Sequence, residues 1–259
     1  MKRITSRDNI HFRELKKLCH SSRERRKKGQ IVLDGMHLVE SFIACHGRLE
    51  EVVFSESGLV RVEIARFAER GKTSWPATVL PDALFNELSN VETPSGILAV
   101  VPAPPAMSEL DDAVDAVVLD SIQEPGNMGS ILRTAAAAGV RQVLLSSDCA
   151  QAWSPKVLRA GMGAHFLLNI HEGCDLMSFL KGYRGQSIAT ALNAADELFS
   201  LDLKVPCAWI FGNEGQGVRP QVLSLARRKV GISMPGAMES LNVTAAAAIC
   251  LFEMVRQRR

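Results

Sequence analysis

The stretch DAVVLDSIQEPGNMGSILRTAAAAGV, residues 115–140, combines an apolar run, a turn and a helix-forming segment. The apolar run from Ala116 to Leu119 shows no polar/apolar alternation, which is typical of a strand covered on both faces of a parallel sheet. Proline and glycine at positions 125, 126 and 129 mark a turn, and the alanines after them favour a helix. The stretch therefore predicts one strand–turn–helix unit of an α/β fold.

The same alternation continues through the second half of the chain. Strand-like runs alternate with helix-like segments near residues 129–138, 154–161, 174–181, 219–227 and 243–257; the runs are DAVVLDS, RQVLLSS, HFLLNI, QSIATAL, CAWIFG and KVGISM. Alternating strands and helices predict a mostly parallel sheet with helices on its faces.

The N-terminal part of the chain has a different texture. It begins with a basic helical arm, and the strands QIVLDG, EEVVFS and GILAVV then enclose helices near residues 36–45 and 60–70. The proline-rich segment VPAPPAMSELDD, residues 101–112, separates the two textures. We expect a smaller N-terminal α/β domain over residues 1–101, a linker over residues 102–113 and the parallel-sheet domain over residues 114–259.

Composition excludes several classes of protein. The 259 residues are 47% hydrophobic and 22% charged, as in soluble globular proteins. No apolar run reaches the ~18 residues of a membrane span, and no apolar signal segment follows Lys2 and Arg3. The six cysteines form no CxxC pair and the six histidines no HxxxH pair, so we expect reduced thiols and no bound metal. These features predict a cytoplasmic protein without a membrane partner.

Positive charge is concentrated at the N-terminus. The first 28 residues hold eleven Lys or Arg against three Asp or Glu, a balance of +8, which leaves −6 for the rest of a chain whose total is +2. A solvated helix face explains such a run as well as a nucleic-acid surface does. If the run binds RNA, the candidate residues are Arg23, Arg25, Arg26, Lys27 and Lys28.

Polar residues gather just after four of the expected strands. The segments SIQEPGNMGS, TALNAADE, GNEGQG and MPGAMESLN follow the runs AVVLD, QSIA, CAWIF and KVGIS. Because ligands of parallel α/β sheets bind outside the carboxyl ends of the strands, these segments predict the position of the functional site.

Each segment also has a simpler explanation. GNEGQG, residues 212–217, lacks both the lysine of a Walker loop and the GxGxxG spacing, so a tight turn alone explains it. Ser240 or Asn242 suits a helix N-cap, although both together with Glu239 exceed what one cap needs. Arg133 on an alanine-rich helix fits a salt-bridged core residue, whereas the free N–H groups at the start of that helix suit an anion such as phosphate.

Taken together, three segments resemble a known family. EPGNMGSILRTAAAAG, WIFGNEGQGV and ISMPGAMESLNVTAAAAI are similar, in this order, to motifs one, two and three of the SpoU family, S-adenosylmethionine-dependent RNA 2′-O-ribose methyltransferases of the SPOUT superfamily. The resemblance is close over residues 114–259. It is looser at the N-terminus, where ITSRDNIHFRELKKL and QIVLDGMHLVESFI are similar to the substrate-binding extension of ribosomal RNA members. It implies a SPOUT-like α/β fold with a deep trefoil knot, which general topology rules would not predict.

The resemblance also implies site residues and partners. The polar catalytic site would consist of Asn127, Arg133, Glu214, Ser240 and Asn242. S-adenosylmethionine would be held mainly by backbone groups of Gly212, Ile232 and Leu241, with Thr190, Ala191 and Met234 nearby. The resemblance further implies a homodimer with the active site at its interface, and RNA as the partner, with ribosomal RNA favoured.

The implied reaction is in-line attack of a ribose 2′-oxygen on the sulfonium methyl group. A guanidinium stays protonated, so we expect Arg133 to anchor the target phosphate rather than act as the base, with Glu214 orienting Arg133 or Asn127. A phosphate oxygen, water or another side chain would then take the proton.

Three alternatives stay open. A tRNA ribose methyltransferase would use the same scaffold, and a non-catalytic RNA-binding protein would keep the fold without the reaction. An ordinary nucleotide-binding α/β protein would use the glycine-rich loop for phosphate. The intact polar residues argue against the second, and the missing Walker lysine and dinucleotide fingerprint argue against the third.

Overall fold

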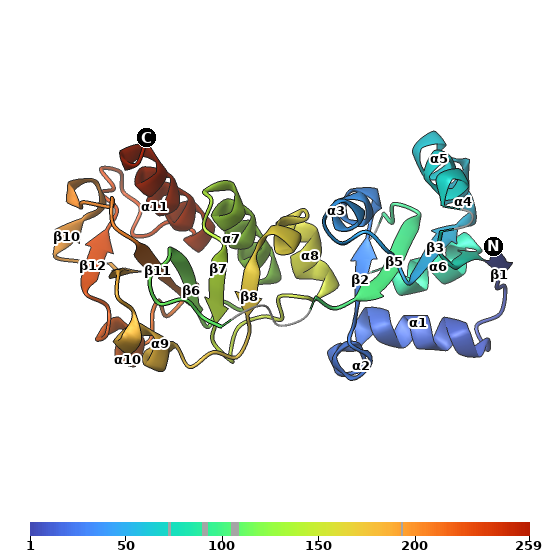
Figure 1. Cartoon of the computed structure of the whole chain (residues 1–259), viewed down its shortest axis with the longest axis horizontal. Helices are drawn as coiled ribbons and strands as arrows, with labels where there is room; N and C mark the ends of the chain where they lie inside the picture. Colours follow the sequence, from blue (N-terminus) through green and yellow to red (C-terminus); the bar gives the residue numbers. More distant parts are fainter. Residues whose placement is uncertain (72–73, 90–92, 105–108, 193) are drawn as a thin grey trace. The chain divides into compact units, whose positions relative to one another are not determined.

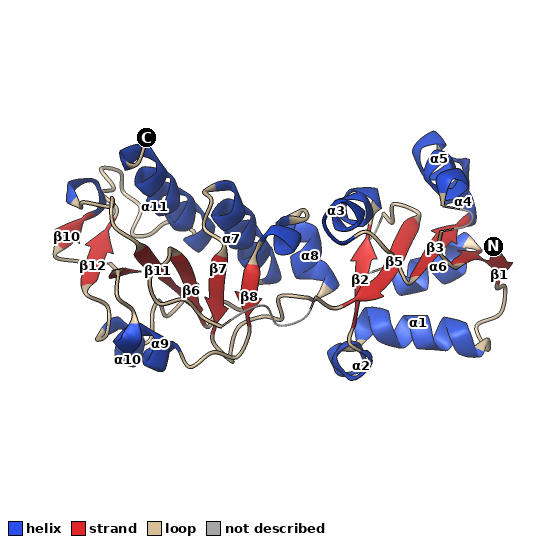
Figure 2. Cartoon of the chain, in the orientation of Figure 1, coloured by secondary structure: helices blue, strands red, loops and turns tan. Residues whose placement is uncertain are grey.

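The computed structural model describes residues 1–71, 74–89, 93–104, 109–192 and 194–259. The chain divides into two compact units, one of Met1–Pro105 with Trp153–Phe166 and one of Ala106–Ala152 with Leu167–Arg259. Each unit has its own β-sheet with helices packed against it (Figures 1 and 2). The division of the sequence at residues 101 and 114 stays a prediction, and residues 105–108 of the expected linker lie outside the described residues, as does Asn193 of the TALNAADE segment.

The first unit is built on a mixed sheet. Its strands, in spatial order, are β1 (Lys2–Arg3), β4 (Ala77–Leu80), β3 (Glu51–Ser55), β5 (Ile97–Pro102) and β2 (Gln30–Asp34). β5 runs antiparallel to both of its neighbours, and the β1–β4 and β4–β3 pairs are parallel. This is the smaller N-terminal α/β domain that the sequence predicts.

Helices cover both faces of this sheet because its strands alternate between two cores. Val32 packs with residues of α1 (Ile10–His20) and α6 (Asp82–Leu88). Ile31 and Leu33 face the other way, toward α3 (Met36–His46) and α5 (Val62–Arg70). α8 (Pro155–Gly161) adds Leu158 to that second core. The short helices α2 (Ser22–Lys28) and α4 (Glu56–Val60) precede β2 and α5 in the chain.

The second unit is a seven-stranded sheet in which every pair is parallel. The order is β10 (Asp196–Glu197), β12 (Arg228–Gly231), β9 (Gln186–Thr190), β11 (Cys207–Gly212), β6 (Ala116–Asp120), β7 (Gln142–Leu145) and β8 (Asn169–His171). The parallel sheet predicted from the sequence is therefore confirmed, and its central strands are buried along their whole length.

Two pairs of helices cover this sheet. α7 (Pro125–Ala137) and α11 (Val243–Gln257) contact each other on one face, and α9 (Leu176–Gly182) and α10 (Pro220–Leu223) lie on the other (Figure 1). Val118 and Ile210 pack beneath α9 and α10. Within the described residues, no helix is both long enough and apolar enough to cross a membrane.

Some elements differ from the sequence prediction. HFLLNI was expected as a strand, but Ala164–Leu167 is a 3₁₀ helix (η1) and only Asn169–His171 is a strand. The backbone at Met162 and Gly163 is left-handed, with φ of 48° and 86°, so the chain turns sharply after α8 before the strand can begin. The helix expected near residues 60–70 is α5, which begins after Arg61, a residue with extended backbone. The elements β1, α4, β4, α6, β10 and η2 (Leu198–Ser200) were not predicted.

The sheet order brings the predicted polar segments together. β12, β9, β11 and β6 are consecutive neighbours and all point the same way. Their carboxyl ends therefore form one continuous edge, and this edge carries the candidate site.

Candidate active site

The Glu214 carboxylate is the centre of the polar site. It lies in the loop after β11, and its oxygens accept hydrogen bonds from the backbone N–H of Gln123 (3.3 Å) and of Glu124 (3.1 Å) in the loop after β6. Oε1 also accepts a hydrogen bond from Nδ2 of Asn127 at 3.0 Å. One carboxylate thus joins two strand-end loops that are 87 to 91 residues apart in the chain.

Asn127 passes the connection on to a third segment. Its Oδ1 accepts a hydrogen bond from Nδ2 of Asn242 at 3.2 Å. Asn242 is the N-cap of α11, where its Oδ1 accepts the backbone N–H of Thr244 at 2.8 Å. Both amide groups are therefore oriented by their partners, and the series Glu214–Asn127–Asn242 links parts of all three sequence motifs.

The same contacts act on the ionisation of Glu214. Partial burial favours the neutral acid, but the hydrogen bonds donated by Asn127 and by the backbone of Glu124 and Gln123 outweigh it. The pKa of Glu214 is therefore below its ordinary value of 4.5, and the carboxylate is charged near neutral pH. An ionised carboxylate only accepts hydrogen bonds, which fits the donors around it.

The loop that carries Glu214 requires glycine where it begins. A Cβ at Gly212 would lie 2.1 Å from the backbone nitrogen of Val218. Asn213 and Gly217 exchange two backbone hydrogen bonds, of 3.0 and 2.8 Å, across the loop. Oδ1 of Asn213 accepts the N–H groups of Gly215 and Gln216. The loop is therefore closed on itself and holds Glu214 at its tip.

The expected cofactor residues lie around the same edge. Thr190, Gly212 and Ile232 end or follow the neighbouring strands β9, β11 and β12. Among the described residues, the backbone N–H groups of residues 232–234 and 236–241 have no hydrogen-bond partner within the chain. Met234 is partly exposed and Leu241 is 40% exposed. Free backbone donors beside accessible apolar side chains suit a nucleoside-like ligand, so these residues fit S-adenosylmethionine.

Thr190 and Ala191 are partly engaged already. The Thr190 hydroxyl donates to the carbonyl of Ile210 at 3.4 Å, and the Ala191 N–H donates to the carbonyl of Val230 at 3.0 Å. The carbonyl of Ala191 is not among the groups with a hydrogen-bond partner in the described chain. A ligand at these two residues would therefore meet the Ala191 carbonyl rather than its N–H.

Arg133 and Ser240 stand apart from this network. Both side chains are exposed, and neither has a hydrogen-bond or ion-pair partner in the part of the chain that the structure describes. The simpler explanation of Arg133, a salt-bridged core residue, therefore does not apply, and its role at the site stays a prediction. Glu214 contacts Asn127 and makes no such contact with Arg133, so only the first of its two expected partners is present.

The basic arm contains two kinds of cation. Arg23, Arg26 and Lys27 are exposed in α2, and Lys28 lies 3.4 Å from Glu14. Arg25 is only 8% exposed, and its Nη1 donates to the carbonyls of Leu18 and Cys19 near the end of α1. The Arg25 side chain therefore links α2 to α1.

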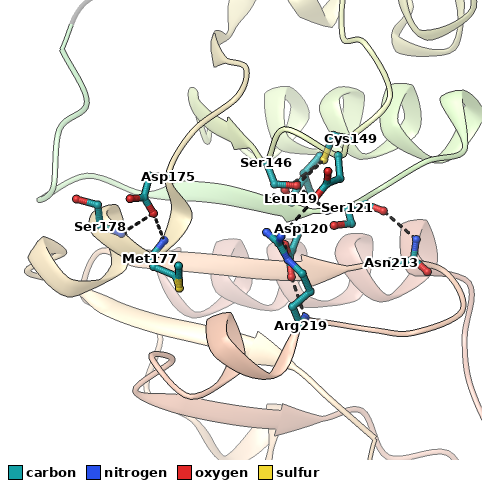
Figure 3. A network of polar contacts seen from close by, with 11 residues as sticks. Leu119, Asp120, Ser121, Ser146, Cys149, Asp175, Met177, Ser178, Asn213 and Arg219 are labelled. Atoms are coloured by element: carbon teal, nitrogen blue, oxygen red, sulfur yellow. Dashed lines mark hydrogen bonds and ion pairs between the residues drawn. The ribbon is translucent and has the colours of Figure 1, made fainter.

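The sequence reading did not single out two charged residues at the centre of this edge. Asp120 ends β6 and is fully buried, and Arg219 follows the glycine-rich loop and binds it (Figure 3). An aspartate directly after an apolar strand is a usable signal, because a buried carboxylate needs a partner. No sequence signal identifies Arg219 as that partner. Within the described residues, no group of His, Cys, Asp and Glu has the arrangement of a metal site.

Comparison with known proteins gives consistent matches for both units. The model of the SpoU rRNA Methylase family matches residues 116–252, and that of the MRM3-like substrate binding domain matches residues 9–99. An uncharacterized tRNA/rRNA methyltransferase of Synechocystis is 33% identical over 98% of this chain and 94% of its own. The 23S rRNA (guanosine(2553)-2′-O)-methyltransferase RlmP of Bacillus subtilis is 30% identical over 98% of this chain and 99% of its own.

A solved structure extends the similarity to the whole fold. The SpoU methyltransferase AviRb of Streptomyces viridochromogenes, in complex with the cofactor AdoMet, is 25% identical with a TM-score of 0.84. The match covers 96% of this chain and 98% of that protein.

Proposed function

The chain belongs to the SpoU rRNA Methylase family, and from this premise we propose that it methylates a ribose 2′-hydroxyl of ribosomal RNA with S-adenosylmethionine as the methyl donor. The enzyme is thus an RNA 2′-O-ribose methyltransferase. The observation that carries the proposal is the Glu214 carboxylate, which ties Asn127 and the start of α7 to the glycine-rich loop. The full-length similarity to a 23S rRNA methyltransferase supports ribosomal RNA as the substrate.

The cofactor residues belong to one edge of the sheet. Backbone groups of Gly212, Ile232 and Leu241 would hold S-adenosylmethionine, with Thr190, Ala191 and Met234 beside it. The bound cofactor supplies a methyl group on a sulfonium sulfur. The chain supplies orientation, because a reaction between two bound partners gains most from being held in line.

Arg133 is the residue we assign to the RNA. Its exposed guanidinium is free of protein partners among the described residues, so its donors are available to a phosphate at the target nucleotide. Since a guanidinium stays protonated, Arg133 stabilises negative charge and does not accept the ribose proton. A phosphate oxygen, water or another side chain would take that proton. Ser240 and Asn242, at the start of α11, would line the path by which the target ribose enters the site.

The basic arm of the first unit gives a second contact with RNA. Arg23, Arg26, Lys27 and Lys28 are exposed on α2 and attract phosphates without reading the base sequence. Arg25 belongs to the same predicted set but is buried. Among the five residues, we therefore expect Arg25 to be the one whose replacement by another helix-compatible cation reduces RNA binding least. The match of residues 9–99 to a substrate binding domain supports RNA binding by the first unit.

Three further properties follow from the family and are part of the proposal. We expect a deep trefoil knot in the second unit, a homodimer with the active site near its interface, and a place in the cytoplasm. The homodimer is tested by the sedimentation velocity of the purified protein, where a monomer at micromolar concentration would contradict it.

The function is tested by transfer of labelled methyl from S-adenosylmethionine to purified ribosomal RNA and, separately, to tRNA. Alkali-resistant label in ribosomal RNA that is lost in Arg133→Ala is the expected result. Label in tRNA alone would replace ribosomal RNA by the alternative substrate. Binding of S-adenosylmethionine without transfer to naked RNA or to ribosomal particles would favour a non-catalytic RNA-binding protein.

A further inference from the structure

Both ends of the loop that carries Glu214 are attached to a single residue, Asp120. The loop leaves the sheet at Gly212, which pairs with Asp120 in the β11–β6 ladder. It returns at Arg219, whose backbone N–H donates to Oδ2 of Asp120 at 2.8 Å. The Arg219 side chain contacts the other carboxylate oxygen, with Nε at 2.7 Å and Nη2 at 2.6 Å from Oδ1.

Burial makes this contact specific. The Asp120 side chain is fully buried, whereas the Arg219 side chain is 41% exposed. A buried carboxylate without partners is strongly unfavourable, so Asp120 requires the three donors of Arg219 in this geometry. Nη1 of Arg219 also lies 3.3 Å from Oδ2 of Asp148, in the loop after β7. Arg219 thus joins three strand ends at the edge where the site lies.

Hydrogen bonds from the neighbouring loops also hold the residue that follows Asp120. Ser121 has φ of 60°, which is strained for a residue with a side chain. Its N–H donates to Oγ of Ser146 at 2.9 Å, and its carbonyl accepts Nδ2 of Asn213 at 2.9 Å. In Figure 3 the side chain of Arg219 reaches Asp120 while that of Asn213 points to Ser121. The sharp turn at Ser121 starts the segment that donates to Glu214.

From this juxtaposition we infer that Asp120 and Arg219 are positioning residues for methyl transfer, because they set the Glu214 loop against the donors of residues 123–127. The inference rests on the proposed function. Internal bonds hold the loop together, so a change at Arg219 displaces the loop as one body and moves the Glu214 carboxylate away from Asn127. Among the described residues, the side-chain hydrogen bonds and ion pairs of Arg219 go to Asp120 and Asp148, and none goes to Arg133 or to an expected cofactor residue.

The test compares Arg219→Ala and Arg219→Lys with wild type and with Arg184→Ala. Arg184 is a matched control, because it also holds an aspartate, Asp112, at 2.6 Å, but at the amino ends of the strands. Two measurements are made: steady-state methyl transfer, and hydrogen–deuterium exchange of peptides that cover residues 121–127 and 212–219. Thermal unfolding is followed for each variant, and only kinetics below its transition are compared.

We expect Arg219→Ala to lower kcat at least tenfold with KM for RNA changed less than threefold, and to speed exchange in both peptides. Arg219→Lys keeps the charge but not the two-pronged contact and is expected to lie between Arg219→Ala and wild type. Because Arg219 acts through Glu214, adding Arg219→Ala to Glu214→Gln should reduce kcat by less than threefold more.

Unchanged exchange in both peptides, or faster exchange with unchanged kcat, would overturn the inference. So would a full additional tenfold loss in the Glu214→Gln background. If wild type transfers no methyl group to any RNA, the proposed function fails, and the positioning role in methyl transfer falls with it. The exchange data still report whether the contact between Asp120 and Arg219 holds the loop.

Discussion

At the scale of single residues, Glu214 is the acceptor in every hydrogen bond that its carboxylate makes among the described residues. Two backbone N–H groups, the side-chain amide of Asn127 and, at 3.5 Å, that of Asn213 donate to it. Glutamine at this position would keep one acceptor oxygen and bring an NH₂ group against donors. The site therefore requires a carboxylate for its charge as well as for its shape.

Glu214→Gln is expected to lower kcat by about tenfold to a hundredfold. Hydrogen bonds to a charged acceptor contribute about 1.5–3 kcal/mol, and each 1.4 kcal/mol corresponds to roughly a factor of ten. Methyl transfer at saturating RNA and cofactor measures the loss, and thermal unfolding serves as the control. Full turnover in this variant would show that the carboxylate has no part in holding Asn127 for the reaction.

The pH dependence follows from the direction of the pKa shift. The folded-state pKa of Glu214 is lowered, so the stabilisation from its charge is complete above its ordinary pKa of 4.5 and is lost as the pH falls through the folded value. The ratio of kcat for wild type to that for Glu214→Gln should therefore stay constant from about pH 9 down to about pH 5. A ratio that falls toward one between about pH 7 and pH 5 would mean that Glu214 titrates near neutrality instead.

At the scale of elements, α11 has a start that serves two purposes. Oδ1 of Asn242 caps the helix, and its Nδ2 donates to Asn127. Aspartate would keep the cap, because Ser, Thr, Asp and Asn all accept from the first-turn N–H groups, but it would place an oxygen against Oδ1 of Asn127.

Two substitutions separate these purposes. Asn242→Asp should unfold at the wild-type temperature or slightly above, since a negative charge is favourable at a helix N-terminus, while its kcat falls about tenfold through the lost donor. Asn242→Ala should lose about 1 kcal/mol of stability as well as activity. Melting curves and turnover of the two variants decide the matter. An active Asn242→Asp enzyme would reduce Asn242 to a helix cap.

The elements also show how far the sequence alone can lead. The continuous apolar strands of the second unit were predicted, because burial on both faces leaves a pattern that composition reveals. The 3₁₀ turn at Ala164–Leu167 was not predicted. It follows the left-handed backbone of Met162, a conformation that the residue type of methionine does not indicate. Likewise, motif order identified Asn127 and Glu214, but only the register of Gly212 opposite Asp120 explains why Arg219 meets that carboxylate.

At the scale of the whole molecule, charge is divided between the two units. The first 28 residues carry eleven of the 30 Lys and Arg residues, and the structure shows which of these are free. Arg7 and Lys16 share Glu87 at 2.6 Å each, whereas Arg23, Arg26 and Lys27 are exposed on α2 with no ion pair among the described residues. A cation without a carboxylate partner breaks no ion pair within the protein when it binds a phosphate.

Replacing Arg23, Arg26 and Lys27 by Gln should therefore weaken RNA binding in a salt-dependent way. Each phosphate contact contributes roughly 0.7–0.9 to the slope of log K against log salt, so three lost contacts should reduce that slope by about two to three. The matched control is the Arg7→Gln, Lys16→Gln double variant, whose cations are held by Glu87 and which should change the slope by less than about one.

Binding of ribosomal RNA measured from about 50 to 200 mM salt gives the slopes. The affinity for S-adenosylmethionine should stay the same in every variant, because all the proposed cofactor residues lie in the second unit. Equal slopes for the triple variant and wild type would remove the arm from the RNA-binding surface and leave its charge as solvated helix. A parallel loss of cofactor affinity would show instead that the substitutions disturb the fold. A reduced slope with intact cofactor binding would assign RNA capture to the arm of one unit and methyl transfer to the sheet edge of the other.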